Sequence, residues 1–292
     1  MFEFKNILTN HLITGDEAGN EGFQSFFSIG RRLVRICTGG LMLCAVCSCA
    51  YAAGIRVASL NLDKKFGPGI VSKIAAQDDL RRADVLLLQE IVDGPESRVA
   101  AEVAAKLGLH SAFEPAFQLD SRFVEGLAIL SRFPMSAPDM TRLSHNDVHF
   151  HTRKRIVMAV TVETPNGPVR IVNTHLDNRI NQSAKLVQLK EVQLFIGSYT
   201  GPCIIGGDFN TGNFRWYSHV LPVPGVQSLN AVLDKSMREQ GFQTPLGAGP
   251  GTLHFLGLKL DWIYLRGLTA LDSGVTPIDF SDHNSVWVTF ER

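Results

Sequence analysis

The sequence lacks a surplus of charge of either sign. It contains 28 lysines and arginines against 28 aspartates and glutamates. The first 53 residues hold four side chains of each kind, so the rest of the chain is also balanced, with 24 basic and 24 acidic residues. A protein that binds nucleic acid through a broad electrostatic surface carries a basic excess. The composition excludes such a surface, and any polyanion binding must depend on a local patch or on metal ions.

Cysteine is scarce outside one short segment. Cys37, Cys44, Cys47 and Cys49 lie close together in an apolar stretch, and only Cys203 lies beyond it. A single cysteine excludes a disulfide framework in the body of the protein. The four clustered cysteines lack the two separated pairs of ligands that a zinc site needs.

The apolar stretch has the order of an export signal. Three arginines at positions 31, 32 and 35 precede a hydrophobic run over residues 36–53, which contains Ala50-Tyr51-Ala52 with the spacing of a cleavage site. We predict a leader over residues 1–53 that exports the protein to the periplasm or the medium, and a catalytic domain over residues 54–292. The alternative is an uncleaved anchor in the inner membrane, because residues 36–53 are near the minimum length of a spanning helix.

Beyond the leader, short apolar runs outnumber helical patterns, and no repeat or low-complexity segment interrupts them. The pattern predicts strands over residues 55–62, 85–88, 111–117, 127–130, 155–164, 169–174, 260–265 and 286–290, and Pro165-Asn166-Gly167-Pro168 predicts that 155–164 and 169–174 form a hairpin. Helices are expected after Gly67-Pro68-Gly69, from Glu96 to about Leu107, and from Ser183 to about Tyr199. Several strands are apolar throughout, which predicts packed sheets with helices outside them.

The segment Cys203–Thr211 ends one apolar run in an acid and an amide. Gly206 and Gly207 predict that a buried strand breaks into a tight turn and presents Asp208 and Asn210 at a sheet edge. An ordinary turn explains the same residues, since Asp and Asn are favoured there. A functional interpretation therefore depends on what the other strands carry.

Other predicted strands carry polar residues at or beside their ends. These residues are Asn61, Glu90, Glu125, His175, Asp261, Asp282 and His283. A polar strand end or a satisfied structural histidine explains each one alone, except that a carboxylate within an apolar strand, as at Asp261, is costly unless it is paired or bound to metal. If the strand ends share one face, they form a site of several carboxylates and two histidines. Such oxygen donors suit Mg²⁺ better than zinc and leave the histidines for acid–base chemistry or phosphate binding.

Together these segments resemble the endonuclease/exonuclease/phosphatase superfamily, which includes pancreatic-type deoxyribonucleases, abasic-site endonucleases, inositol-polyphosphate 5-phosphatases and neutral sphingomyelinases. The matching motifs, in family order, are Ala58-Ser59-Leu60-Asn61, Leu88-Gln89-Glu90, Gly126-Leu127-Ala128-Ile129-Leu130-Ser131-Arg132, Asn173-Thr174-His175-Leu176, Gly207-Asp208-Phe209-Asn210, Leu260-Asp261-Trp262-Ile263 and Ser281-Asp282-His283. Each motif is short, but seven in order are specific. The resemblance implies an α/β fold, a four-layer sandwich of two packed mixed β-sheets flanked by helices, with Mg²⁺ or Mn²⁺ as the cofactor.

The resemblance also implies which residues hold the metal. Glu90 would be the main ligand, Asn61 and Asp282 would complete that side, and Asp63 would be a further ligand. The metal would neutralise charge that develops on the phosphoryl oxygens.

The remaining residues receive catalytic roles from the same resemblance. Asp208 would orient or deprotonate the attacking water, and Asn210 would hold that water or a phosphate oxygen. His283, supported by Asp261, would contact the scissile phosphate, while His175 would act on the side of the leaving group.

Three further residues have less specific signals. Glu125 falls where pancreatic-type nucleases place the acid that pairs with the histidine at position 175. Arg153 and Arg155 are suited to phosphate contacts, although a solvated strand end explains at least one of them.

We therefore predict an exported, Mg²⁺-dependent phosphodiester hydrolase of the endonuclease type. The alternatives are a lipid phosphodiesterase or phosphatase, and a non-catalytic binding module on the same fold, against which the full set of site residues argues. The expected partner is the phosphodiester substrate, either nucleic acid or a phospholipid head group. We expect a monomer with no obligate protein partner.

Overall fold

The computed structural model describes residues 54–145, 153–212, 214–217, 221–224, 228–247 and 249–292. The predicted leader, its cleavage site and the anchor alternative lie outside these residues, so they stay predictions. Among the described residues, no helix is both long enough and apolar enough to cross a membrane.

The first strands of the domain and the last two form a seven-stranded mixed sheet. Its strands run in the order β13 (Thr269–Thr276), β14 (Ser285–Glu291), β1 (Ile55–Asn61), β2 (Val85–Gly94), β5 (Val124–Ser131) and β4 (His110–Gln118), with β3 (Ser97–Arg98) beside β2. β1 and β2 are parallel, and the other pairs are antiparallel. The β13 strand was not predicted, because its sequence mixes polar and apolar residues without clear alternation.

The middle of the chain forms a five-stranded mixed sheet. Its order is β12 (Asp261–Arg266), β9 (Cys203–Asp208), β8 (Gly167–His175), β7 (Ile156–Thr164) and β6 (Asp139–Arg142). The predicted hairpin is confirmed as β7 and β8, and β8 runs parallel to β9. β6 and a separate hairpin of β10 (Phe214–Tyr217) and β11 (Leu221–Pro224) were not predicted.

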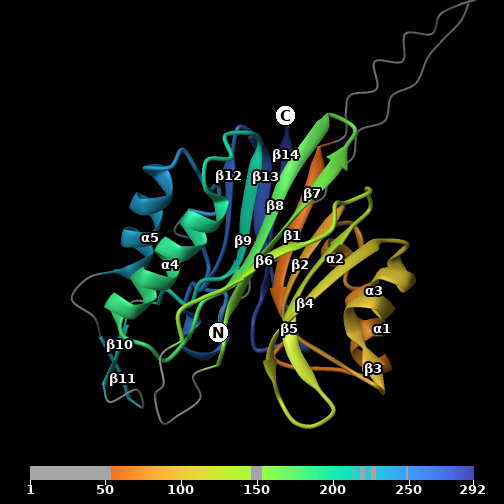
Figure 1. Ribbon diagram of the computed structural model, residues 1–292, viewed down its shortest axis with the longest axis horizontal. Coiled ribbons are helices and arrows are strands. Elements are labelled where there is room, and N and C mark those ends of the chain that lie inside the picture. Colours follow the sequence, from red (N-terminus) through yellow and green to blue (C-terminus); the bar gives the residue numbers. More distant parts are fainter. Residues whose placement is uncertain (1–53, 146–152, 213, 218–220, 225–227, 248) are drawn as a thin grey trace, which may run out of the picture. The chain divides into compact units, whose positions relative to one another are not determined.

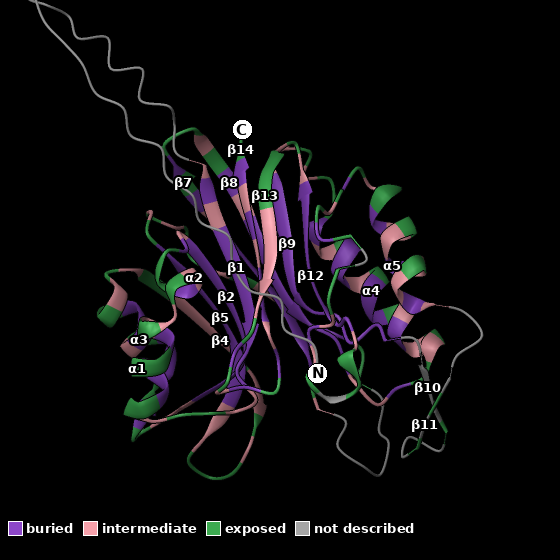
Figure 2. Ribbon diagram, turned by 180° about the vertical axis from the view of Figure 1, so that it is seen from behind, coloured by how far each residue is buried: buried purple, intermediate pink, exposed green. Residues whose placement is uncertain are grey.

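Helices cover the outer faces of both sheets (Figure 1). They are α1 (Pro68–Ala76), α2 (Asp78–Arg81), α3 (Val99–Leu107), α4 (Gln182–Ile196) and α5 (Leu229–Arg238), with a short 3₁₀ turn at Phe255–Gly257. α1, α2 and α3 pack against the seven-stranded sheet, while α4 and α5 pack against the five-stranded sheet. Figure 2 shows the buried residues concentrated along the strands and the inner helix faces. The predicted four-layer sandwich is confirmed.

The topology brings the polar strand ends to one end of the sandwich. Parallel neighbouring strands end on the same side of a sheet. β1 and β2 therefore end together, and so do β8 and β9. Their antiparallel neighbours β14, β5, β7 and β12 begin on that same side. The shared face that the sequence analysis required is therefore present.

Gly206 and Gly207 do not form the predicted turn. β9 continues through both residues to Asp208. Gly207 has φ 136°, and a Cβ there would lie 1.9 Å from the carbonyl oxygen of Thr174 on β8. A Cβ at Gly206 would lie 2.5 Å from the side chain of Leu87 in the opposite sheet. The glycines therefore allow close approach inside the sandwich, and the turn comes after Asp208.

Candidate active site

Three of the predicted site residues form one row across the five-stranded sheet. His175 on β8 pairs in register with Asp208 on β9, and Asp208 pairs with Asp261 on β12. All three residues are almost completely buried. The last residue of each parallel strand and the first residue of β12 thus meet by strand register alone.

The seven-stranded sheet presents Glu90 through an irregularity in β2. The pairing between β2 and β5 shifts register between Leu88 and Ile91, and Glu90 has φ 52°. Such a bulge turns a side chain away from the regular alternation and is common beside active sites. It directs the Glu90 carboxylate into the same pocket as His175, whose Nε2 lies 3.9 Å from Glu90 Oε1.

The strand ends surround a pocket of about 290 Å³. Most of the predicted site residues line it, and several unpredicted polar residues join them. The lining residues are Asn61, Asp63, Lys64, Glu90, His175, Asn178, Arg179, Asp208, Asn210, Leu253, Leu260, Asp282 and His283. Asp261 and Glu125 lie behind this lining, where they contact residues that form or support it.

Asp208 is held in place from both sheets. Its Oδ2 accepts a hydrogen bond from Asn61 Nδ2 at 3.0 Å, and its Oδ1 accepts one from the backbone N–H of Asn210 at 2.9 Å. His175 Nε2 lies 3.3 Å from Oδ2. Burial and the neighbouring Asp261 raise the pKa of Asp208 to about 7. A carboxylate with such a pKa is suited to accept a proton from water near neutral pH.

His283 and Asp261 form the predicted pair. His283 Nδ1 lies 2.7 Å from Asp261 Oδ2, and His283 Nε2 lies 3.9 Å from Asp208 Oδ2. Burial disfavours the charged ring, but the Asp261 carboxylate prevails and raises the pKa of His283 to about 10. His283 therefore presents a positive Nε2–H to the pocket, as a partner for a phosphate oxygen.

His175 is supported differently from the prediction, because Arg155 lies between it and Glu125. Arg155 Nη1 lies 3.1 Å from Glu125 Oε1 and 2.9 Å from His175 Nδ1, and Arg153 also binds the Glu125 carboxylate. Arginine only donates hydrogen bonds, so Nδ1 must accept and the ring proton lies on Nε2. Burial and the charge of Arg155 lower the pKa of His175 well below its usual value. His175 is therefore a neutral donor, and the Arg155 side chain is buried rather than a solvated strand end.

The predicted metal ligands suit a hard divalent cation. Glu90, Asp63 and Asp282 offer carboxylate oxygens around one side of the pocket. The Lys64 ammonium contacts Glu90 and lies 3.4 Å from Asp63 Oδ1, so a cationic group already occupies this anionic position. Burial opposes the charge of Glu90, but Arg155 and Lys64 keep the pKa of its carboxyl below the ordinary value.

Among the described residues, two groups have possible ligand atoms that all lie within 4.8 Å of one another inside the group. They are Glu90, Glu125 and His175 in one group, and Asp208, Asp261 and His283 in the other. In the first group the Glu125 carboxylate forms ion pairs with two arginines, so Glu90 is the accessible ligand of that group. In the second group His283 is hydrogen-bonded to Asp261, and strand register places Asp208 beside Asp261.

Sequence reasoning missed Lys64, Asn178, Arg179 and Lys185. The first three lie within four residues of predicted site residues, so position was their available signal. Lys185 lies on the buried face of α4 and donates to the carbonyl of Asn210. Burial lowers the pKa of its ammonium to about 8. Its helical spacing from the apolar residues of α4 was the sequence signal that could have identified it.

The chain is similar to known proteins. Residues 58–283 match the model of the "Endonuclease/Exonuclease/phosphatase family". The chain is 30% identical over 125 residues to a UPF0294 protein of Yersinia pseudotuberculosis, which is 41% of this chain and 42% of that protein. The chain therefore spans about two fifths of the length of this curated relative.

Solved structures show the same fold at low identity. An endonuclease/exonuclease/phosphatase from Beutenbergia cavernae has a TM-score of 0.66 and 19% identity, over 82% of this chain and 72% of that one. The catalytic domain of human nocturnin, solved with a sulfate anion, has a TM-score of 0.60 and 18% identity, over 82% of this chain and 93% of that one.

Proposed function

Because this chain belongs to the endonuclease/exonuclease/phosphatase family, we propose that it is a divalent-metal-dependent hydrolase of phosphodiester bonds. Members of the family hydrolyse phosphate esters, and they generally depend on a divalent metal. The observation that carries the proposal is the environment of Asp208, which is buried, oriented from both sheets and has a pKa of about 7.

The water-activating step belongs to Asp208 and Asn210. Hydrogen bonds from Asn61 and Asn210 fix both oxygens of the Asp208 carboxylate, so its free lone pairs have set directions. We infer that this carboxylate accepts the proton of the attacking water. Asn210 has φ 50°, and its side-chain Nδ2 donates to the carbonyl of Leu176, which fixes the turn that follows Asp208.

Charge on the phosphate is met by the two histidines and the metal side of the pocket. His283 donates a charged hydrogen bond from Nε2, and His175 donates a neutral one from its own Nε2. Mg²⁺ or Mn²⁺ held by Glu90, Asn61, Asp63 and Asp282 would neutralise charge on the phosphoryl oxygens. Because Arg155 occupies His175 Nδ1, His175 stabilises the departing oxygen by hydrogen bonding and does not begin as an imidazolium acid.

A substrate panel tests the proposed function. Wild-type protein with Mg²⁺ or Mn²⁺ would be assayed on DNA, RNA, phosphoinositide and sphingomyelin, with Asp208→Ala as the blank. We expect hydrolysis of at least one substrate that the variant does not support. DNA or RNA cleavage would favour the endonuclease prediction, and lipid cleavage would favour the head-group alternative. Equal activity of the variant, or no hydrolysis at all, would remove the enzymatic assignment.

We also propose that the enzyme is exported. The support is the order of the three arginines, the apolar residues 36–53 and Ala50-Tyr51-Ala52. Mass spectrometry of the protein from its natural compartment should find a chain that begins at Ala53. An intact N-terminus in a membrane fraction would instead support the anchor.

A further inference from the structure

We propose that Lys185 is a positioning residue for the hydrolysis, which holds the turn after Asp208 in its working conformation from behind the catalytic pocket. The inference rests on the proposed function, because it assigns a supporting role in that enzyme's reaction. Lys185 lies on the buried face of α4 and is 4% exposed. It does not line the catalytic pocket itself, so its effect on the reaction must pass through residues that do.

The Lys185 ammonium bonds to the loops that follow two parallel strands of the five-stranded sheet. Nζ donates to the carbonyl of Asn210, in the turn after β9, at 2.5 Å. It also donates a longer bond, of 3.5 Å, to the carbonyl of Asn178 in the loop after β8. Asn210 and Asn178 both line the catalytic pocket. One buried cation therefore joins two segments of the pocket wall.

The turn that Lys185 holds also orients the Asp208 carboxylate. The backbone N–H of Asn210 donates to Asp208 Oδ1 at 2.9 Å, and the Asn210 carbonyl accepts from Lys185. Asn210 has φ 50°, in the left-handed region that residues other than glycine seldom adopt. A cation bonded to the Asn210 carbonyl favours this conformation, in which the N–H of the same residue reaches Asp208.

Packing alone does not explain a lysine at this position. Burial lowers the pKa of Lys185 to about 8, although the carboxylates of Asp208 and Asp177 favour its charged form. Among the described residues Lys185 forms no ion pair, and its Nζ hydrogen bonds go to the two carbonyls. An apolar side chain of similar length would fill the same face of α4 without the cost of burying a charge. The ammonium is therefore explained by the carbonyls that it binds.

A second residue on the same face of α4 holds one of these loops. Gln188 lies three positions after Lys185 and is fully buried. Its Oε1 accepts a hydrogen bond from the backbone N–H of Asp177 at 2.9 Å. The loop after β8 is thus fixed at Asp177 by Gln188 and at Asn178 by Lys185. This loop in turn gives Lys185 a fixed place from which to bind the Asn210 carbonyl.

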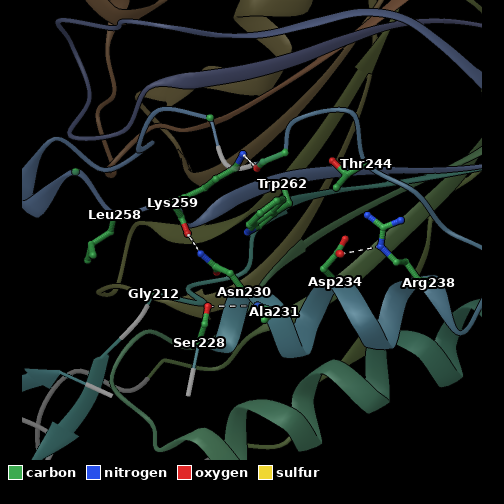
Figure 3. Close-up of a pocket in the computed structure, with 13 residues that line it drawn as sticks. Gly212, Ser228, Asn230, Ala231, Asp234, Arg238, Thr244, Leu258, Lys259 and Trp262 are labelled. Carbon is green, nitrogen blue, oxygen red and sulfur yellow. Dashed lines mark hydrogen bonds and ion pairs between the residues drawn. The ribbon is translucent and has the colours of Figure 1, made fainter. Parts of the chain in front are cut away.

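Helix α5 covers the same sheet but faces a different pocket. Its residues Asn230, Asp234 and Arg238 line a pocket of about 510 Å³ between α5 and β12 (Figure 3). Asn230 Nδ2 donates to the carbonyl of Lys259, and Arg238 pairs with Asp234. Among the described residues, none lines both this pocket and the catalytic one. The lysine contact with the turn after Asp208 thus comes from α4.

Matched substitutions on α4 test the proposal through kinetics. Lys185→Met removes the ammonium and keeps a side chain of similar length, whereas Lys190→Met makes the same change at an exposed position of the same helix. On the substrate that wild type hydrolyses best, Lys185→Met should lower kcat about tenfold, the effect of one lost hydrogen bond. KM and the affinity for Mn²⁺ should stay unchanged, because Lys185 contacts neither the substrate nor the metal side of the pocket. Lys190→Met should match wild type.

Hydrogen exchange followed by NMR tests the positioning without any assay of activity. In Lys185→Met the protection factor of the Asn210 backbone amide should fall about tenfold, while the amides within β9 keep theirs, because the change is confined to the turn. Lys185→Gln has a polar side chain that is one bond shorter. It should lose kcat and Asn210 protection in the same way, and it carries the test if Lys185→Met does not fold.

Three outcomes would overturn the inference. They are a wild-type kcat in the variant, unchanged protection of the Asn210 amide, and an equal loss of protection along α4 and β9, which would show a purely structural role. If wild type hydrolyses nothing on the substrate panel, the proposed function fails separately. The exchange measurement then decides alone whether Lys185 holds the turn.

Discussion

The seven-stranded sheet contributes Asn61 and Glu90 to the catalytic pocket, whereas the five-stranded sheet contributes His175 and Asp208, with Asp261 directly behind them. On the first side Glu90 binds Lys64, Asn61 is buried and donates to Asp208, and the nearby Asp282 side chain is 53% exposed. Those on the second side contact one another in register and are almost fully buried. The first side is thus open to exchange of its cationic partner, and the second is fixed by hydrogen bonds.

This difference separates two tasks that every metal-dependent phosphoesterase performs. An ion must enter and leave, which suits partly exposed carboxylates with a displaceable ammonium beside them. Proton transfer needs fixed geometry and shifted pKa values, which burial provides. The comparison predicts that variants on the two sides will fail in different ways.

Asp208→Asn should have the largest effect on catalysis. We expect kcat to fall about 10⁴-fold, the upper end of the contribution of a general base. Because Asp208 lies on the buried side, the affinity for Mn²⁺ measured by calorimetry should stay unchanged. A variant that loses Mn²⁺ binding together with activity would erase the distinction between the two sides.

Glu90→Gln should show the opposite combination. We expect activity at fixed Mg²⁺ to fall about 10²- to 10³-fold, because one charged contact at the reacting phosphate is weakened. The Mn²⁺ affinity should fall with it, and raising the metal concentration should restore part of the rate. Lys64→Met is the matched companion, because it removes the competing ammonium and should strengthen Mn²⁺ binding. Unchanged Mn²⁺ affinity in Glu90→Gln would contradict the ligand assignment.

Arg155→Met should have a smaller effect, since Arg155 acts through His175. We expect a loss of roughly 10- to 100-fold, as is typical for residues that orient a ligand or catalyst. Nitrogen NMR of the imidazoles should find the His175 proton on Nε2 in wild type and a mixture of tautomers in the variant. Arg155→Lys, which retains a donor, should recover part of the activity. If His175 carries its proton on Nδ1 in wild type, the arrangement described above is wrong.

The pH dependence of stability should give the smallest and most specific effect. The pKa of Asp208 is raised from an ordinary 3.8 to about 7 in the folded protein, so the fold prefers the protonated carboxyl. Its contribution to stability is therefore complete below pH 4 and is lost as the pH rises through 7. In metal-free buffer with EDTA, Asp208→Asn should melt a few degrees higher than wild type at pH 8, and this advantage should shrink toward pH 4. An equal difference at both pH values would mean that Asp208 titrates normally.

The sequence predicted the central strands well because they are apolar and end abruptly in polar residues. The strand Val85–Leu88 and the hairpin around Gly167 are examples, and both are present. It missed α5, although Leu229 and Leu233 have helical spacing, because the sequence around that segment shows no helical or strand periodicity. It also missed β13, whose residues mix polar and apolar types and are exposed or partly exposed, so no alternation marks them.

The site was predictable as a set of residues but not as a set of contacts. Asp208 and His283 stand in short motifs that can be recognised from the sequence alone. The bridge from Glu125 through Arg155 to His175 has no such motif, because it joins side chains that lie 30 and 20 positions apart in the chain. The function of Gly207 was also misjudged, since the carbonyl of Thr174 that demands it belongs to another strand.

The sequence by itself determined which polar groups end the strands and in what order, and with them the family and the layered fold. Strand alternation and abrupt polar ends are local properties, so they can be read along the chain. The tertiary structure alone decided the tautomer of His175 and the raised pKa of Asp208. Each of these depends on burial and on hydrogen bonds between segments far apart in the chain, and these exist only once the two sheets have packed together.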